Sequence, residues 1–377
     1  MTASTSELQL PRILAVGAQP EALEQLIDEL RHCGLSTTSA SPDALAEDMT
    51  DGVDLIAIDD SIDSIVRKQW EAQWRQRAPS IRIIRTHAPY AASQVVAAAQ
   101  SDAAGAVDLP SYIARIGYDG PLKPTMETLS GLLECHIAAI PFEAIDVVLG
   151  RGIDLTPRTV DAKLIGAKRG GYCYEQNGLF KRVLSAIGFD VEAMVASVRW
   201  MAAPGVPPNP LTHMALRVYV EEEPWLVDVG FGGNMPPAPL RMETTAAQPT
   251  RLETYRIIPN GLRLLLQVRI NDQWMSLYNL APEPVLDNHF EMPNWYTSTH
   301  PSSHFRRELN VARTTPQARY ALLGNRFTLR SQGRMERYFL DSIEVIDVLE
   351  DVFGLKPEPG WERLADNFLP DSSEQAP

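Results

Sequence analysis

The sequence predicts a multidomain protein in which an N-terminal α/β module with a doubly wound parallel sheet precedes an α+β region. The chain has 377 residues, enough for two to four compact units. Over residues 1–110, short apolar runs alternate with stretches of helical period, as in a parallel sheet covered by helices. From residue 111, Gly, Pro and aromatic residues become frequent before new helical and strand patterns begin, which indicates a domain start.

The elements of the first module follow from the period of its apolar residues. Strands are expected at residues 12–18, 35–41, 54–60, 81–89 and 106–110. Helices are expected at residues 20–34, 64–80 and 90–105. The run at 54–60, DLIAIDD, is apolar without alternation, which indicates a strand buried on both faces.

This module resembles a response-regulator receiver domain, in which Asp59 or Asp60 would take the phosphoacceptor position at a strand end. That family needs an acidic pair after the first strand to hold magnesium, but residues 17–20 read Gly-Ala-Gln-Pro. It also expects a lysine before the closing proline, and Leu109 precedes Pro110 here. Without metal ligands, phosphoryl transfer loses its electrostatic support. We therefore expect a degenerate receiver-like module with a binding or regulatory role, which could involve a protein partner. The aspartate at the strand end is expected to be solvated and not phosphorylated.

The remaining elements are read in the same way. Helices are expected at residues 126–140, 159–168, 178–189 and 341–354. Strands are expected at residues 191–201, 213–232, 254–259, 263–280 and 326–330. The polar tail at residues 371–377 is expected to be disordered.

Charge and hydropathy exclude several partners. The net charge is −14 with no basic run, so nucleic acid and anionic membrane surfaces are poor candidates. No apolar run approaches the roughly 18 residues of a membrane span, and the N-terminus lacks the basic start of a signal peptide. We expect a cytoplasmic protein.

The three cysteines, Cys33, Cys135 and Cys173, form no CxxC pair. This sparse set argues against a disulfide framework and a structural zinc site, so no metal is expected. Cys33 and Cys135 fit packing positions next to or on helices.

Cys173 lies in the stretch RGGYCYEQNG at residues 169–178. It follows Gly170 and Gly171 and precedes an apolar helical pattern, which indicates the first turn of a helix. Unpaired backbone N–H groups and the helix dipole favour a thiolate there and can hold an oxyanion. A buried thiol beside a turn fits the same ten residues, so the stretch alone leaves both interpretations open.

Two other residues decide in favour of a nucleophile. His213 opens a strand after the proline-rich loop at residues 203–212. Asp228 interrupts an apolar run, and a buried carboxylate needs a partner, which a neighbouring antiparallel strand carrying His213 would supply. Each residue is by itself more readily structural. Together, Cys173, His213 and Asp228 reproduce the logic of a catalytic triad.

These motifs resemble, in order, those of the arylamine N-acetyltransferase family. RGGYCYEQN, THMALRV and LVDVGFG carry the resemblance, supported by ARIGYDG, AAIPFEAID and YTSTHPSSHF. It spans most of residues 111–364, about two thirds of the chain. The resemblance implies a helical domain at residues 111–200 with the cysteine, a β-barrel at residues 201–290 with the histidine and aspartate, and an α/β lid at residues 291–370.

Carried over to this sequence, the resemblance implies that Cys173 is the nucleophile, His213 the base and Asp228 the acid that orients it. It also implies an aromatic acceptor pocket and a glycine beside the pantetheine arm of the acyl donor. The pocket residues are Phe142, Tyr174, Phe231 and Phe305, and the glycine is Gly232. Core packing is the simpler role for any one of these rings, but as a set they suit a flat aromatic amine.

The implied reaction is acetyl transfer from acetyl-CoA to an arylamine, arylhydrazine or N-hydroxyarylamine through an acetyl-cysteine, a ping-pong scheme that serves xenobiotic metabolism. Three alternatives stay open. A related acyltransferase or amide synthase would use another acyl donor. A transglutaminase-like cysteine hydrolase shares the order Cys, His, Asp. A ligand-binding protein dominated by the receiver-like module would have no catalysis, and the intact triad argues against it.

Overall fold

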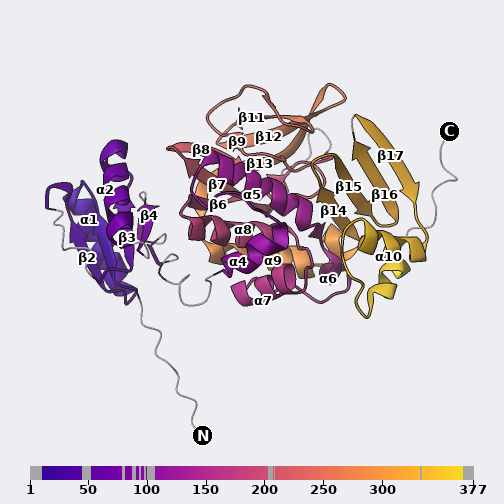
Figure 1. Ribbon diagram of the computed structural model, residues 1–377, viewed down its shortest axis with the longest axis horizontal. Helices are drawn as coiled ribbons and strands as arrows, with labels where there is room; N and C mark the ends of the chain where they lie inside the picture. Colours follow the sequence, from indigo (N-terminus) through magenta and orange to yellow (C-terminus); the bar gives the residue numbers. More distant parts are fainter. Residues whose placement is uncertain are drawn as a thin grey trace, which may run out of the picture. The chain divides into compact units, whose positions relative to one another are not determined.

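A computed structural model gives the fold. It describes residues 11–44, 52–78, 81–86, 91–92, 95–96, 99, 107–202, 207, 209–331 and 333–367. The chain divides into two compact units, Met1–Ala106 and Val107–Pro377 (Figure 1). The tail expected to be disordered lies outside the described residues. Within the described part, no helix is long and apolar enough to cross a membrane.

The first unit contains a four-stranded parallel sheet in the order β2-β1-β3-β4. Its strands are β1 (Ile13–Val16), β2 (Thr37–Ala40), β3 (Leu55–Asp59) and β4 (Arg82–Thr86), and its helices are α1 (Pro20–His32) and α2 (Ser64–Arg77). Apolar clusters cover both faces of the sheet, one including α1 and the other Trp74 of α2. The predicted doubly wound arrangement of these elements is confirmed.

The strand expected at residues 106–110 is wrong. Val107 and Asp108 lie outside any strand, and Leu109 begins helix α4 (Leu109–Ile116) of the second unit. The Asp108 carboxylate accepts hydrogen bonds from the backbone N–H of Ser111 at 3.1 Å and from its hydroxyl at 2.6 Å. An N-cap aspartate followed by proline in the first turn is a helix start, and it overrides the short apolar pattern.

Two other expectations for this unit can be placed. Most of the helix expected at residues 90–105 lies outside the described residues, although Val95 and Ala99 pack in the α1 cluster. At the end of β3, the Asp59 carboxylate accepts a hydrogen bond from the N–H of Ser61 at 2.9 Å, which closes a local turn.

The second unit is built on an eight-stranded antiparallel sheet. In pairing order its strands are β10 (Gln248–Pro249), β11 (Thr254–Asn260), β12 (Arg263–Ile270), β13 (Gln273–Val285), β6 (Asp190–Val198), β7 (Leu211–Val220), β8 (Glu223–Val227) and β9 (Leu240–Arg241). The two end strands meet through one side chain: the Gln248 amide donates to the Arg241 carbonyl at 3.0 Å and accepts from its N–H at 2.8 Å. The sheet thus curls toward a barrel, and it begins at β6, before the boundary expected at residue 200.

A five-stranded antiparallel sheet forms the other end of this unit, in the order β17-β16-β15-β14-β5. Its strands are β5 (Phe142–Glu143), β14 (Asn310–Thr314), β15 (Ala318–Leu323), β16 (Arg326–Ser331) and β17 (Arg334–Phe339). Helix α10 (Ser342–Asp351) packs on it around buried Val345 and Leu349. Because β5 comes from the helical segment, the expected helical and lid regions share one sheet.

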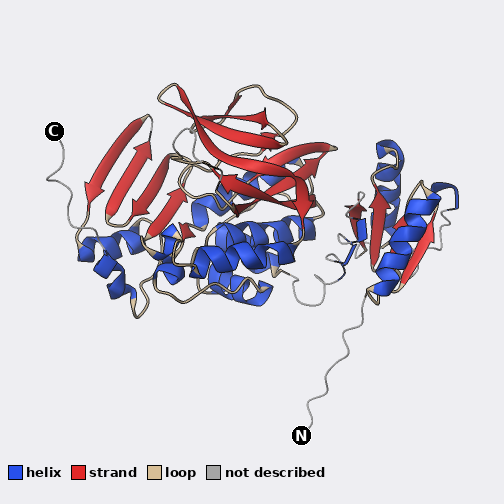
Figure 2. Ribbon diagram, turned by 180° about the vertical axis from the view of Figure 1, so that it is seen from behind, coloured by secondary structure: helices blue, strands red, loops and turns tan. Residues whose placement is uncertain are grey.

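The helices of the second unit gather on one side of its two sheets (Figure 2). Besides α4 and α10 they are α5 (Met126–Ala139), α6 (Ile145–Val148), α7 (Pro157–Asp161), a π-helical turn (Ala162–Gly166), α8 (Cys173–Ile187) and α9 (Glu291–Thr299). One apolar cluster joins α4, α5 and α8 to the buried face of β7. Burying this face provides most of the packing energy that fixes α8 on the sheet.

A buried polar chain also ties the helices together. The hydroxyl of Tyr112 on α4 bonds to Nδ1 of His136 on α5 at 2.7 Å, and His136 Nε2 bonds to Oε1 of Gln176 on α8 at 2.8 Å. The Gln176 amide then donates to the carbonyls of Pro141 and Gly171, both at 3.0 Å. Burial lowers the pKa of His136 to about 4 despite the bond to Gln176, so the ring is neutral at physiological pH.

We predict that His136 makes the second unit sensitive to acid. Its folded pKa of about 4 lies below the ordinary value near 6.5, so the unfolded chain binds the proton first. The stabilisation is complete above about pH 6.5 and is lost as the pH falls toward 4, at up to about 1.4 kcal/mol per pH unit. Denaturant unfolding of His136→Gln should show lower stability at pH 7 and a shallower pH dependence. The exposed His289 supplies the control, His289→Gln; parallel curves for all three proteins would contradict the assignment.

Candidate active site

Cys173 is the first residue of α8 and is buried, with 6% of its surface exposed. Two glycines make this start possible. A Cβ at Gly170 would lie 2.1 Å from the Pro141 carbonyl oxygen, and one at Gly171 would lie 2.7 Å from the Glu175 carboxylate. Glu175 in turn accepts a hydrogen bond from the N–H of Tyr172 at 3.0 Å. The predicted position of Cys173 at a helix N-terminus is confirmed.

His213 and Asp228 meet as the sequence predicted. His213 lies on β7, Asp228 follows β8, and these strands are antiparallel neighbours. The Nε2 atom of His213 lies 2.7 Å from Oδ2 of Asp228, with both side chains buried. A bulge between β6 and β7 falls beside His213, at Ala196, and such bulges aim side chains. Cys173 also raises the pKa of this imidazole, so the three side chains form one electrostatically coupled chain.

The electrostatics of this chain favour a cationic imidazole. Burial, the largest influence, lowers the pKa of His213, but the charge and hydrogen bond of Asp228, followed by Cys173, raise it to about 10 overall. His213 is therefore protonated at neutral pH and can face a thiolate.

Asn177 and Gly230 complete the site and were not given a role from the sequence. Asn177, one turn after Cys173, donates to Asp228 Oδ1 at 3.1 Å and to the Met214 carbonyl at 2.8 Å. Its Oδ1 accepts from the N–H of Val229 at 3.0 Å. A Cβ at Gly230 would lie 2.5 Å from Cα of Cys173, so only glycine fits. Asn177 stands in the motif RGGYCYEQN, but its partner 51 residues away was not readable there.

Two aromatic rings enclose the imidazole. The ring centres of Phe231 and Tyr278 lie 5.1 and 4.9 Å from that of His213. Tyr278, on β13, is fully buried, and burial followed by the Asp228 charge raises the pKa of its phenol well above the ordinary value. Tyr278 thus stays neutral beside the ion pair and excludes water from it. Phe231 is one of the rings that the resemblance named, whereas Tyr278 comes from a strand that no motif marked.

The other predicted pocket residues form a second aromatic group. Phe142 and Phe305 lie with ring centres 6.0 Å apart, and Tyr172 lies 6.2 Å from Phe305. Gly232, with φ +89°, presents its backbone to Phe142, whose ring would meet an added Cβ at 3.4 Å. The structure therefore brings Phe142, Phe305 and Gly232 together next to the residue that precedes Cys173.

Tyr174 is placed differently. Its hydroxyl donates to the Thr212 carbonyl at 2.7 Å, beside His213, and its ring packs between Tyr172 and Phe290 at 5.2 and 5.7 Å. The hydroxyl is thus committed to holding the start of β7.

A buried ion cluster supports the turn before Cys173. Arg169 bonds to Glu143 at 2.7 Å and to Asp146 at 3.0 Å, and Lys163 lies 2.9 Å from both Asp146 and Glu175. Burial, the largest influence on each base, lowers its pKa, but the surrounding carboxylates outweigh it and raise the pKa of Lys163 and Arg169. Removing one member would leave uncompensated buried charge, which typically costs about 3–5 kcal/mol.

Among the residues that the structure describes, no group of three or more His, Cys, Asp or Glu side chains is arranged to hold a metal ion.

Comparison with known proteins establishes the family. Residues 125–359 match a family model described as N-acetyltransferase. The arylamine N-acetyltransferase of Mycolicibacterium smegmatis is 40% identical over 254 residues, 66% of this chain and 92% of that protein. The chain belongs to the arylamine N-acetyltransferase family. The arylamine N-acetyltransferase of Escherichia coli K12 is 36% identical over 250 residues, 66% of this chain and 88% of that protein.

Solved structures agree. The arylamine N-acetyltransferase of Mycobacterium marinum in complex with CoA superposes with a TM-score of 0.67 at 38% identity, covering 70% of this chain and all of that one. The Salmonella typhimurium arylamine N-acetyltransferase gives 0.63 at 37%, covering 66% and 90%. The predicted arylamine N-acetyltransferase fold is confirmed for about 70% of the chain, and the matched family residues lie wholly within the second unit.

We predict that Asp228 controls the reactivity of Cys173. In Asp228→Asn, the main charge that keeps His213 protonated is gone, so alkylation of Cys173 by iodoacetamide at pH 7 should slow at least about tenfold. In the wild type, His213 stays cationic up to a pH near 10, so the rate should be nearly constant between pH 7 and 9. Peptide mass spectrometry separates Cys173 from the other two cysteines. Asp287 is an exposed carboxylate paired with Lys181, so Asp287→Asn is the control. Equal alkylation rates in the two variants would show that Asp228 does not control the reactivity of Cys173.

Proposed function

We propose that this protein transfers an acetyl group from acetyl-CoA to an arylamine, arylhydrazine or N-hydroxyarylamine through an acetyl thioester on Cys173. The observation that carries the proposal is the buried chain of Cys173, His213 and Asp228, at a helix start, in a member of this family. The solved M. marinum relative in complex with CoA supports acetyl-CoA as the donor.

The first half-reaction uses the ion pair. The Cys173 thiolate attacks the thioester carbonyl of acetyl-CoA, and a carbon–sulfur bond to Cys173 forms. Backbone N–H groups at the start of α8 have no partner within the helix and would stabilise the oxyanion. When the bond to CoA breaks, the departing CoA sulfur takes the proton of His213, which leaves a neutral imidazole and acetylated Cys173.

The second half-reaction restores the site. The acceptor nitrogen, or the oxygen of an N-hydroxyarylamine, attacks the acetyl carbonyl, and neutral His213 takes the proton that it loses. The bond to Cys173 breaks, the acetylated product leaves and the thiolate–imidazolium pair returns. Asp228 fixes the imidazole with Nε2 toward itself, so the other ring nitrogen serves Cys173 and the substrates.

The surrounding residues would select flat acceptors. We assign Phe142, Phe231 and Phe305 to the walls of the acceptor site, because their rings flank His213 and the turn before Cys173. The Tyr174 ring would add to this wall, while its hydroxyl holds Thr212. Gly232 would let the pantetheine arm pass close to the backbone, since it carries no side chain.

The first unit supplies none of these residues. We propose that it is a degenerate receiver-like module with a binding or regulatory role, on the strength of its parallel sheet and strand order. We also propose a cytoplasmic location, in keeping with the composition of the chain.

We predict that Cys173→Ala abolishes release of CoA from acetyl-CoA in the presence of an aromatic hydrazine, because no acetyl-enzyme forms. Intact-protein mass spectrometry of the wild type with acetyl-CoA alone should show one added acetyl group, absent from the variant. Cys135→Ala, which removes a half-buried thiol from α5, is the matched control and should keep both signals. Turnover at the wild-type rate in Cys173→Ala would refute the nucleophile assignment.

We predict that a chain beginning at Val107 retains kcat/KM within about twofold, since all proposed residues lie beyond it. A chain beginning at Ser111 lacks the Asp108 cap of α4 and should be less stable by about 1 kcal/mol. Steady-state assays and thermal unfolding compare the two. A folded but inactive Val107 chain would show that the first unit takes part in catalysis.

A further inference from the structure

A polar cavity lies away from the residues assigned to catalysis, between the β12–β13 turn and the β16–β17 hairpin. Its volume is about 480 Å³, within the range of small-molecule sites. Four arginines, Arg269, Arg319, Arg330 and Arg334, line it together with two carboxylates, Glu253 and Asp272. This is a local excess of two positive charges in a chain of net charge −14.

The arginines are not equally neutralised. Arg319 is buried and holds both oxygens of Glu253, at 2.7 to 3.0 Å, together with the Tyr255 hydroxyl and the Met235 carbonyl. Arg330 reaches only one oxygen of the same Glu253, at 3.6 Å. One carboxylate is thus shared by two guanidinium groups. The positive charge of Arg330 is therefore only partly compensated, although only 25% of its side chain is exposed.

The position of Arg330 is fixed although its charge is not balanced. Its Nη2 donates to the Gly233 carbonyl at 3.1 Å and also bonds to the Asn234 side chain. Burial, the largest influence, lowers the pKa of Arg330; Glu253 opposes this and Arg319 adds to it. An anion in the cavity would therefore relieve an existing electrostatic cost.

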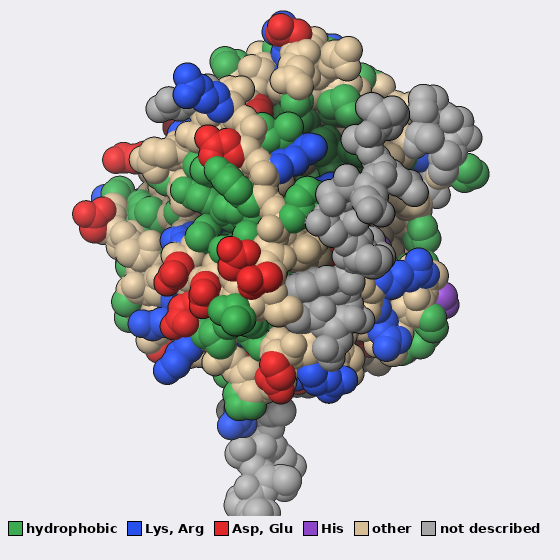
Figure 3. Space-filling view, turned by 90° about the vertical axis from the view of Figure 1, so that its right-hand side faces the viewer, with side chains coloured by type: hydrophobic (Ala, Val, Ile, Leu, Met, Phe, Trp, Pro, Cys, Tyr) green, Lys and Arg blue, Asp and Glu red, His purple; other side chains and the backbone are tan. Residues whose placement is uncertain are grey.

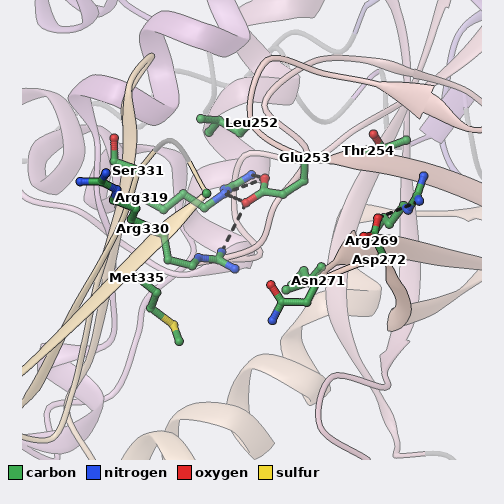
Figure 4. A pocket seen from close by; sticks show the side chains of 13 residues that line it. Leu252, Glu253, Thr254, Arg269, Asn271, Asp272, Arg319, Arg330, Ser331 and Met335 are labelled. Atoms are coloured by element: carbon green, nitrogen blue, oxygen red, sulfur yellow. Dashed lines mark hydrogen bonds and ion pairs between the residues drawn. The ribbon is translucent and has the colours of Figure 1, made fainter.

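The rim adds further groups that an anion can use. Arg334 begins β17 and is exposed, and within the described residues it has no carboxylate partner. Arg269 is paired with Asp272 at 2.8 Å. Figure 4 shows Arg330, Met335 and Asn271 extending toward the same open space.

The cavity also has an apolar part. Leu252, Ile270 and Met335 line it beside the charged groups. On the face that carries β16 and β17, a hollow holds basic side chains among hydrophobic ones (Figure 3). A purely inorganic ion would not contact these apolar side chains.

We propose that this cavity binds an organic phosphate monoester. The dianionic phosphate lies between Arg330 and Arg334, because guanidinium groups match phosphate oxygens in bidentate geometry. The organic part covers Leu252, Ile270 and Met335. Two sources share this chemistry: the 3′-phosphorylated nucleotide end of acetyl-CoA, which rests on the proposed function, and a free phosphorylated metabolite, which does not.

Phosphate binding in this cavity would affect the catalytic region through the backbone of residues 232–234. Arg330 holds Gly233 and Asn234, and the residue before them is Gly232, which packs against Phe142. An anion that draws the Arg330 guanidinium toward the cavity would weaken its bonds to this loop. The site would then couple phosphate binding to the width of the proposed donor passage.

The experiment is calorimetric titration of the full chain with adenosine 3′,5′-bisphosphate and, separately, with inorganic phosphate. We expect the bisphosphate to bind more tightly, binding to weaken as salt rises, and Arg334→Gln to reduce its affinity about tenfold. Arg326→Gln removes the same charge from an exposed position at the far end of the hairpin and is the matched control. Its affinity should change by less than about twofold. Thermal unfolding verifies that both exposed-site variants are folded.

Kinetics then separate the two sources. If Arg334→Gln raises KM for acetyl-CoA but not for acetyl-dephospho-CoA, the ligand is the nucleotide end of the donor. If it changes neither KM yet loses bisphosphate affinity, the ligand is a free organic phosphate. Absence of bisphosphate binding to the wild type, or equal affinity in Arg334→Gln and Arg326→Gln, overturns the site. Because the titration needs no catalysis, this result is independent of the fate of the proposed function.

Discussion

The second unit is arranged around one buried carboxylate. Asp228 is 1% exposed, and a charge at that depth would cost several kcal/mol without partners. It receives them from three directions: His213 on β7, Asn177 on α8 and the N–H of Gly230 in its own loop. Satisfying this charge brings a helix and two strands to one point. Cys173 reaches the imidazole because it lies one turn before Asn177 on the same helix.

Polar groups position the helices, while apolar packing supplies most of the free energy that holds them. A buried ion cluster fixes the turn before α8; its members are Glu143, Asp146, Lys163, Arg169 and Glu175. The neutral hydrogen-bonded chain through His136 joins α8 to α5 and α4. Buried networks of this kind stabilise little in net terms, but breaking one member leaves an unsatisfied charge or dipole. They therefore restrict α8 to one position on the sheet.

Much of the site could be predicted from the sequence because its residues carry local signals. Two glycines before a helical pattern place Cys173, and an aspartate within an apolar run requires a partner such as His213. Asn177 and Tyr278 carry no such signal, since their roles depend on contacts made only when the helix and the curled sheet meet. The four arginines of the polar cavity, spread over residues 269–334, are equally unrecognisable as a group in the sequence.

The fold was predictable where apolar period and turn residues agree, as in the sheet of the first unit. At residues 106–110 they conflict, because a short apolar run contains the cap and proline of a helix start, and the helix forms. Domain boundaries were less readable, since β5 pairs with β14 and β6 pairs with β13, both far along the chain.

The contact between Gly230 and Cys173 makes the position of the sulfur independent of the side chains that surround it. At this point the backbone after β8 lies against the backbone of α8 without any intervening side chain, as the 2.5 Å approach of an added Cβ shows. The sulfur is therefore located by main-chain atoms, whereas the walls around it are side chains from other segments. Under the proposed function, substitutions in the walls assigned to the acceptor site would alter which acceptors bind while Cys173 stays in place. Substrate range can thus diversify among descendants of this chain without each change having to rebuild the reacting centre.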